Sequence, residues 1–523
     1  MNLEQLKIIS AGAGSGKTYR LTEEMVALLE AGDVRPSGII ATTFTRKAAA
    51  ELQERVRVKL LKEGLTQQAD ELTNALIGTV HGLGVKLLRR FAFEAGVSPQ
   101  VDILPDGEQQ QMFNQALAAA LSLERIEDMD ELSDRLGLTK RTGFFDWRRE
   151  VRTIVDIARA NDFSLADIEN SKKKSWLSFA DFLPDVGQLS AQDAYAQLAA
   201  SLNDTIRELE QGEDHTKTTS SATDKLKAFR RELQLRGSLH WYQWAAIGKL
   251  KVGAKSRDKV ESLQTLVWEH SSLPAFQQDI KRFIDQLFAT AIDALQEYDE
   301  YKKRRGLIDY TDMEVLVSRL LDKKAVKSVL ADELDLLMVD EFQDTNPIQL
   351  EVFLKLSQLA TFSVWVGDPK QSIYGFRGAE PRLMEAIIQA AGGIKAENVQ
   401  TRSWRSRADL VYMVNDLFGQ AFPDLPEAQI ALEPVRVPEG NEFCPAEPIQ
   451  SEDAIIHWHF TAEGERRTPP AKPWMENCLA RSIKEMLEAG ITIQPKGSDE
   501  FRKAAAGDVA ILCRSNAACN TVA

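Results

Sequence analysis

A glycine-rich stretch near the start of the chain constrains its fold more than any other feature. Residues Ala11–Thr18, AGAGSGKT, follow an apolar run at Leu6–Ile9 and precede a helical pattern that stops at Gly32. Strand, glycine loop and helix in this order form a cradle for a phosphate chain, because backbone N–H groups and the helix N-terminus face the phosphates. The order therefore predicts an α/β fold that binds a nucleoside triphosphate at the loop.

Two side chains of the loop are expected to carry its chemistry. Lys17 places a positive charge on the β- and γ-phosphates, and the Thr18 hydroxyl binds Mg²⁺. Because Ala11 replaces the usual first glycine, the match is to the relaxed pattern, and a tight turn that contains a lysine by chance is the alternative. The residues assigned to nucleotide binding are Ala11, Gly12, Ala13, Gly14, Ser15, Gly16, Lys17 and Thr18.

Composition excludes several classes of protein. The 523 residues allow about two to four domains, and no apolar run approaches the ~18 residues of a membrane span. Without a signal-peptide pattern, we expect a cytoplasmic protein with no membrane partner. A net charge of −14 argues against a protein that coats nucleic acid nonspecifically through a basic surface. It permits a local basic cleft. The 4 cysteines lack the spacing of metal ligands.

Apolar runs elsewhere predict the rest of a parallel sheet with a helical insertion. Runs at Ile39–Thr43 and from Ile77 are each followed by helical patterns, Leu334–Val339 suits a strand buried on both faces, and Phe362–Val366 is a further strand. Between these groups, from about residue 105 to 300, the sequence is rich in Ala, Gln, Leu and Glu and reads as mostly helical.

The last part of the sequence suggests a second α/β unit. Gln400–Asp409 reads as a strand-to-helix turn, and Asp508–Asn516 is predicted to be a buried strand followed by a turn. Because the sequence stops soon after this strand, we expect a fragment or a truncated relative of a longer protein.

A pair of acids follows one of the predicted buried strands. Asp340 can hold Mg²⁺ opposite Thr18, and Glu341 can orient and deprotonate a water molecule for attack on the γ-phosphate. Paired acids at a strand end are also common as solvated turn residues, so the interpretation depends on the glycine loop.

Six short segments along the chain form a set: Ala11–Thr18, Thr43–Ala49, Thr79–His81, Val339–Thr345, Val366–Gly378 and Trp404–Ser406. They occur in the order of motifs I, Ia, Ib, II, III and IV of the superfamily 1 UvrD/Rep-type DNA helicases, which the chain resembles over almost its whole length. The Lys370–Gln371 pair, the segment Asp309–Asp312 and the long helical insertion are most similar to the RecB/AddA branch.

The resemblance implies an α/β fold: a RecA-like P-loop parallel sheet with a large helical insertion and a second, incomplete RecA-like domain. We expect domain 1A, which binds ATP, to consist of residues 1–104 and 301–392, the second part carrying motifs II and III. Residues 105–300 would form the helical domain 1B, and residues 393–523 a partial domain 2A.

The resemblance also implies roles at an ATP–Mg²⁺ site. Gln371 matches the motif III glutamine that touches the γ-phosphate, and Arg405 matches the motif IV arginine that stabilises charge in the transition state, so both join Lys17 and Glu341 as catalytic residues. Trp404 stands where the family stacks an aromatic ring on adenine, and a buried tryptophan at a strand end is the alternative.

For DNA, the family implies aromatic rings that stack on bases and donors that face the backbone. The stacking positions are matched by Phe44, Tyr374 and Phe376. The backbone positions are matched or flanked by Thr45, Arg46, Thr79, His81 and Arg377. Each aromatic ring taken alone is more often part of a core, and His81 lacks a second ligand at metal spacing.

The first functional hypothesis is the N-terminal part of a RecB/AddA-like helicase. Such a protein is an ATP-dependent 3′–5′ translocase on single-stranded DNA or duplex ends, in repair, recombination or defence, and its possible partner is a nuclease or helicase subunit. Motifs V and VI and a nuclease cluster are not found in this sequence. The alternatives are a non-motor ATP- and DNA-binding subunit completed by a partner and, more weakly, a P-loop enzyme acting on a small molecule.

Overall fold

A computed structural model describes residues 6–100, 103–139, 145–373, 375, 378–423, 430–436, 455, 457, 470–493, 495 and 500–522. The chain divides into two compact units, residues 1–436 and 437–523.

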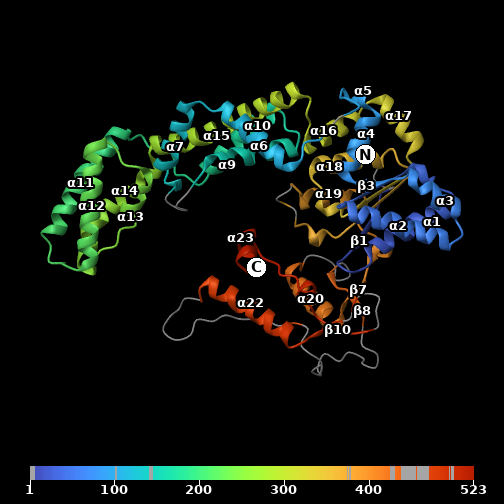
Figure 1. Ribbon diagram of the computed structural model, residues 1–523. Helices are drawn as coiled ribbons and strands as arrows, with labels where there is room; N and C mark the ends of the chain where they lie inside the picture. The colour runs from blue at the N-terminus through green and yellow to red at the C-terminus, as the bar shows by residue number, and fades with distance from the viewer. Residues whose placement is uncertain are drawn as a thin grey trace. The chain divides into compact units, whose positions relative to one another are not determined.

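A six-stranded sheet forms the centre of the first unit (Figure 1). Its strand order is β3-β2-β4-β5-β1-β6, and every neighbouring pair is parallel. The predicted parallel α/β sheet is thereby confirmed. The strands are β1 (Leu6–Ala11), β2 (Ile39–Thr43), β3 (Leu76–Thr79), β4 (Leu336–Asp340), β5 (Phe362–Gly367) and β6 (Val399–Gln400).

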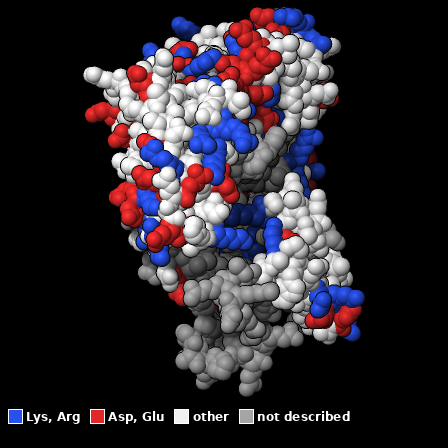
Figure 2. Space-filling model, turned by 90° about the vertical axis from the view of Figure 1, so that its left-hand side faces the viewer, with Lys and Arg blue, Asp and Glu red and all other residues white. Residues whose placement is uncertain are grey.

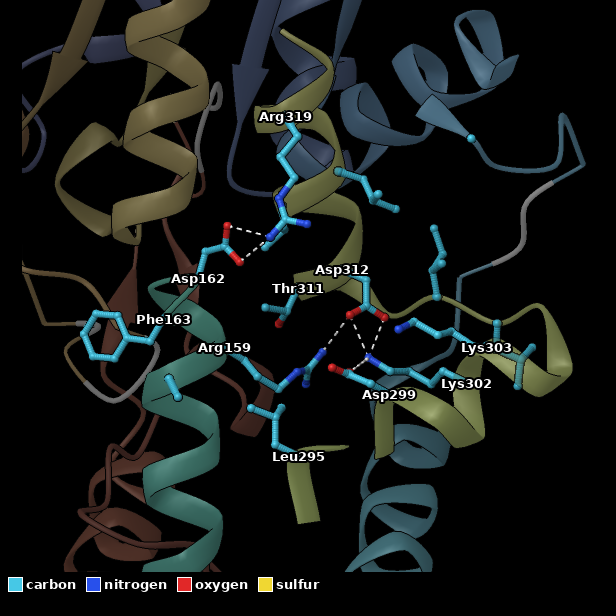
Figure 3. Close-up of a pocket in the computed structure, with 16 residues that line it drawn as sticks. Arg159, Asp162, Phe163, Leu295, Asp299, Lys302, Lys303, Thr311, Asp312 and Arg319 are labelled. Atoms are coloured by element: carbon cyan, nitrogen blue, oxygen red, sulfur yellow. Dashed lines mark hydrogen bonds and ion pairs between the residues drawn. The ribbon is translucent and has the colours of Figure 1, made fainter. Parts of the chain in front are cut away.

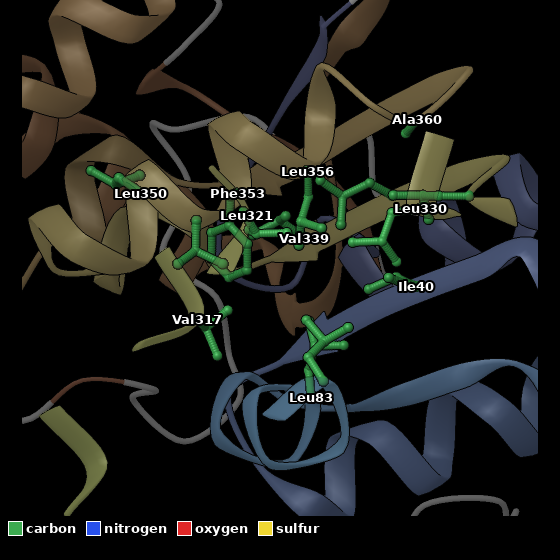
Figure 4. Close-up of a cluster of buried hydrophobic side chains, with 14 of the residues drawn as sticks. Ile40, Leu83, Val317, Leu321, Leu330, Val339, Leu350, Phe353, Leu356 and Ala360 are labelled. Carbon is green, nitrogen blue, oxygen red and sulfur yellow. The ribbon is translucent and has the colours of Figure 1, made fainter. Parts of the chain in front are cut away.

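Helices cover both faces of this sheet, because successive side chains of each strand point to opposite faces. In β4, Leu337 and Val339 pack on one face of the sheet, where Figure 4 shows Val339, and Leu336 and Met338 pack on the other. The first face is covered by α4 (Val80–Arg90), α16 (Tyr310–Leu320), α17 (Lys324–Glu333), α18 (Pro347–Ser357) and α19 (Pro381–Ala390), with the short α5 (Ala92–Ala95) after α4. The second face is covered by α1 (Lys17–Glu30), α2 (Arg46–Lys62) and α3 (Thr66–Glu71).

The predicted helical insertion is confirmed. Serine and threonine N-caps begin several of its helices, and its apolar side chains form clusters around Trp241 and Trp244 and around Trp147 and Tyr298. The 32-residue α15 leads back to the sheet and ends at Gly306, with φ +65°. The helices are α6 (Asp106–Ala120), α7 (Leu123–Arg135), α9 (Trp147–Ala160), α10 (Leu165–Ala180), α11 (Ala191–Glu210), α12 (Lys217–Arg236), α13 (Trp241–Gly248), α14 (Arg257–Trp268) and α15 (Pro274–Arg305).

After β6 the first unit continues into a small strand–helix–strand segment. It consists of β7 (Arg402–Arg407), α20 (Ala408–Ala421) and β8 (Glu433–Arg436), and β7 pairs with β8 in parallel. The described part of the second unit contains α22 (Lys472–Glu488), β9 (Thr492–Ile493), β10 (Arg502–Lys503) and α23 (Asn516–Val522).

The buried strand expected at Asp508–Asn516 is not found. The run Val509–Cys513 is irregular, and Leu512 is 98% exposed. An apolar run forms a buried strand only where neighbouring strands and a core cover it. In the described part of the second unit the two short strands, β9 and β10, pair with each other.

Among the described residues, no helix has the length and apolar character that crossing a bilayer requires. On the face drawn in Figure 2, basic and acidic side chains are interspersed rather than separated by sign.

Candidate nucleotide and DNA site

The glycine loop connects β1 directly to α1. Gly14 has φ +79° and Gly16 has φ +92°, a region that L side chains rarely adopt, so both positions need glycine. The loop is tightened at Gly12, whose carbonyl accepts hydrogen bonds from the Ser15 backbone N–H at 3.1 Å and the Ser15 hydroxyl at 2.8 Å. The loop is therefore a tight turn between β1 and α1 whose backbone depends on glycine at two positions.

Lys17 meets the second acid of motif II. Its ammonium group donates to both carboxylate oxygens of Glu341 at 2.6 Å, and the two side chains are 15% and 28% exposed. Glu341 itself has φ +52°, which is strained for a residue other than glycine and is typical of functional sites. The loop and the end of β4 thus share one small polar site.

The carboxyl groups beside Glu341 are protonated more easily than usual. Burial and the neighbouring Glu341 carboxylate raise the pKa of Asp340 to about 7, and the same two causes raise the pKa of Asp344 to about 6. Asp344 Oδ1 is buried and accepts no hydrogen bond from the described residues. Carboxylate and hydroxyl oxygens are the ligands that Mg²⁺ prefers, so Asp340 and Thr18 fit a magnesium site.

Motif III is joined to motif II by a chain of hydrogen bonds. The side-chain amide of Gln371 donates to Asp368 at 2.7 Å, and Lys370 pairs with the same carboxylate at 2.9 Å. The Asp368 backbone N–H donates to Gln343 Oε1 at 2.9 Å, and Gln343 Nε2 donates to Glu341 at 2.7 Å. Sequence reasoning missed Gln343 and Asp368, although both lie inside the two motifs that it quoted.

The start of β7 lies against the glycine loop. The Trp404 backbone N–H donates to the Gly14 carbonyl at 2.8 Å, and a Cβ placed on Gly14 would lie 2.7 Å from the Arg405 Cβ. Trp404 is 55% exposed, so its side chain is not the buried tryptophan of the alternative interpretation. Motif IV is therefore adjacent to motif I.

Motifs Ia and Ib follow neighbouring strands. Thr43 at the end of β2 is in register with Thr79 at the end of β3, so the segments that follow them emerge side by side. Phe44 is 41% exposed and Arg46, the first residue of α2, is also exposed. Thr45 is the N-cap of α2, its hydroxyl accepting from the Ala48 N–H.

Thr79 and His81 begin α4. The Thr79 hydroxyl accepts from the Gly82 N–H as the N-cap, and the His81 side chain is 43% exposed with its ring stacked on Tyr310 at 4.2 Å. Tyr374, Phe376 and Arg377 lie outside the described residues.

A buried ion cluster joins the helical insertion to the sheet. Asp309 is 0% exposed and accepts hydrogen bonds from Arg159 at 2.6 Å and from the Tyr298 hydroxyl at 2.9 Å. Lys302 pairs with Asp312 at 2.7 Å beside a cavity of about 430 Å³ (Figure 3). Burial opposes ionisation of Asp309, but Arg159 and Lys302 hold its pKa below the ordinary carboxyl value.

The fold and the loop define a P-loop nucleoside-triphosphate-binding protein of the α/β class. The sequence model described as the UvrD/REP helicase N-terminal domain matches residues 2–391, so the chain belongs to this family, as its motifs indicated.

Curated relatives are named as the A subunits of ATP-dependent helicase/nucleases. The protein of Lactobacillus acidophilus is 22% identical over 97% of this chain and 46% of its own length, and that of Bacillus thuringiensis is 25% identical over the same shares. The protein of Streptococcus equi subsp. zooepidemicus is 27% identical over 79% of this chain and 37% of its own length. The chain spans about half the length of the curated relatives it matches.

Proposed function

We propose that the chain is the ATP-hydrolysing, DNA-binding part of a 3′–5′ helicase of RecB/AddA type. The observation that carries the proposal is the continuous set of contacts from Lys17 through Glu341 and Gln343 to Asp368 and Gln371. It links the glycine loop to motif III, and a P-loop enzyme that acts on a small molecule has no need of this link.

In this proposal each motif residue has a separate role in the hydrolysis of ATP. The glycine loop and Lys17 hold the triphosphate, and Trp404 stacks on the adenine. When the γ-phosphate draws Lys17 away, Glu341 orients the attacking water and accepts its proton, while Arg405 stabilises the charge that develops. Mg²⁺, held by Asp340 and Thr18, would neutralise negative charge on the phosphate oxygens.

The proposed DNA path crosses the ends of β2 and β3. Phe44, with Tyr374 and Phe376, would stack on the bases of a single strand, and the neighbouring donors would hold its backbone. These donors are Thr45, Arg46, Thr79, His81 and Arg377. The relatives are named as parts of a helicase/nuclease, which supports a role in repair, recombination or defence together with a partner subunit.

The test is ATP hydrolysis by the full chain with Mg²⁺, with and without oligothymidylate. We expect DNA to stimulate turnover, and Glu341→Gln to lower it at least about 100-fold while nucleotide still binds. Glu51→Gln, on the exposed side of α2, is the control and should behave as wild type. A rate of ATP hydrolysis that does not change when DNA is added would contradict the helicase function. Binding of both ATP and DNA without hydrolysis would favour a non-motor subunit.

A further inference from the structure

Glu314 is a buried carboxylate that the proposed mechanism does not use. It lies on α16, its side chain is 6% exposed, and both of its oxygens have partners. Oε1 accepts from Gln349 Nε2 at 2.6 Å and lies 3.2 Å from His81 Nε2, and Oε2 accepts from Asn346 Nδ2 at 2.9 Å. A buried carboxylate is tolerated only when such donors compensate its lost hydration.

Two of these donors form the start of α18, the helix that follows motif II. Asn346 and Gln349 make a capping box: Asn346 Oδ1 accepts from the Gln349 N–H at 2.8 Å, and Gln349 Oε1 accepts from the Asn346 N–H at 3.3 Å. Capping uses the oxygen of each amide, so both NH₂ groups are left to face Glu314. The carboxylate therefore holds the chain five residues after Glu341.

The third partner, His81, is exposed on its other side, in the segment proposed to meet DNA. Its ring stacks on Tyr310 of α16. The helices α4 and α16 also touch closely at Gly84, where an added Cβ would overlap the Met313 sulfur. A shift of His81 is therefore passed to α16 rather than absorbed between the helices.

The N-terminus of α16 is held in place as well. The N-terminus of α16 carries Asp309 and Asp312, which the ion cluster ties to α9 and α15. The helix α16 is held at its start and packed against α4. A displacement of His81 is therefore transmitted through Glu314 to the start of α18.

We infer that Glu314 is a positioning residue that couples the DNA-facing edge at His81 to the acidic segment of the nucleotide site. The inference rests on the proposed function, because it presumes that DNA contacts His81. Glu314 moves no proton in this role. It holds the start of α18, and through it Glu341, in a position that depends on where His81 lies.

The test measures coupling rather than turnover. The affinity of the full chain for ATPγS–Mg²⁺ is determined with and without saturating oligothymidylate, and we expect DNA to change it at least about fivefold in the wild type. In Glu314→Gln the coupling should fall below about twofold, while each ligand alone binds within about threefold of the wild type. Glu351→Gln, an exposed acid on the same α18, is the matched control and should keep the coupling.

A second variant separates positioning from folding. The double change Glu314→Gln with Gln349→Glu keeps one carboxylate and one amide between α16 and α18, and glutamate suits the capping box at position 349. Thermal stability should return to that of the wild type while the coupling stays lost, because position 314 no longer presents a carboxylate to His81. Coupling that returns together with stability would overturn the inference, as would wild-type coupling in Glu314→Gln.

The failures of the two proposals are distinguishable. A wild-type chain that does not bind oligothymidylate contradicts the proposed function itself. A wild-type chain that binds both ligands and shows coupling, with Glu314→Gln unchanged, contradicts only the role of Glu314.

Discussion

At the scale of single residues, Asp340 shows how a carboxylate that is proposed to bind Mg²⁺ can lower the stability of the fold. Its raised pKa means that the native protein binds a proton more tightly than the unfolded chain between about pH 4 and about pH 7. The stability of the native state therefore falls as the pH rises through this range. A divalent cation removes the penalty, because it favours the ionised carboxylate.

Asp340→Asn should therefore stabilise the protein in the absence of Mg²⁺. The amide oxygen can still accept from the Glu341 N–H, a bond of 3.0 Å in the wild type. We expect a gain on the order of 2 kcal/mol at pH 8 and almost none at pH 4.5. Thermal melts at the two pH values measure it, and Mg²⁺ should raise the melting temperature of the wild type only. A variant that melts below the wild type at pH 8 would contradict this account.

At the scale of elements, the turn between β1 and α1 combines two demands at one residue. Gly14 needs a positive φ, and it also approaches the Arg405 Cβ closely. Gly32, which follows α1, has a similar φ of +74° but no atom within 4 Å of its would-be Cβ. Substitutions at these two glycines therefore distinguish the effect of backbone strain, which both positions share, from the effect of contact with β7, which only Gly14 makes.

Gly14→Ala should lower nucleotide affinity at least about tenfold, because the new methyl group pushes β7 and the loop apart. Gly32→Ala carries comparable backbone strain and should cost about 1 kcal/mol of stability with unchanged nucleotide affinity. Titration with a fluorescent nucleotide and chemical denaturation measure the two effects. Equal loss of affinity in both variants would show that strain alone is responsible.

The sequence and the structure agree best where the pattern is local. β1, β2, β4 and β5 were predicted because short apolar runs bounded by polar residues suit buried strands. The run at Val509–Cys513 has the same local pattern, yet it forms no strand, because pairing depends on neighbours elsewhere in the chain.

The predicted site shows the same limit. The glycine loop and the two acids are readable as motifs, but the bond between Gln343 and Asp368 and the contacts of Glu314 join residues far apart in the sequence. The spacing of residues along the sequence does not predict contacts between segments that are far apart in the chain. The roles in ATP hydrolysis and DNA binding given to the motif residues stay predictions.

At the scale of the whole molecule, the buried ion cluster at Asp309 holds the insertion to the sheet domain. Asp309→Asn keeps the shape of the side chain but removes the fully buried one of the two carboxylates that face Arg159 and Lys302, so that Asp312 alone pairs with both cations; this should cost about 3 kcal/mol of unfolding free energy at pH 7. Chemical denaturation measures this loss. Asp162→Asn, which breaks the exposed pair with Arg319 drawn in Figure 3, should cost less than about 1 kcal/mol.

The pH dependence gives a further check on the cluster. Because the pKa of Asp309 is lowered, its contribution to stability is present above the ordinary carboxyl value of 3.8 and is lost as the pH falls below it. The difference between Asp309→Asn and the wild type should therefore shrink in acid. A constant difference across this range would mean that packing, and not charge, holds the junction.

The strand order of the central sheet has a consequence for biosynthesis. Both neighbours of β1, namely β5 and β6, come more than 350 residues after it in the chain, so β1 leaves the ribosome long before either of its partners has been synthesised. The helices α11 to α14 contact one another within residues 191–268 and can pack earlier, whereas α6 and α9 pack against α15, which is synthesised much later. The nascent chain can therefore fold the helices α11 to α14 before it completes the central sheet, and the apolar strand β1 stays accessible to chaperones until then.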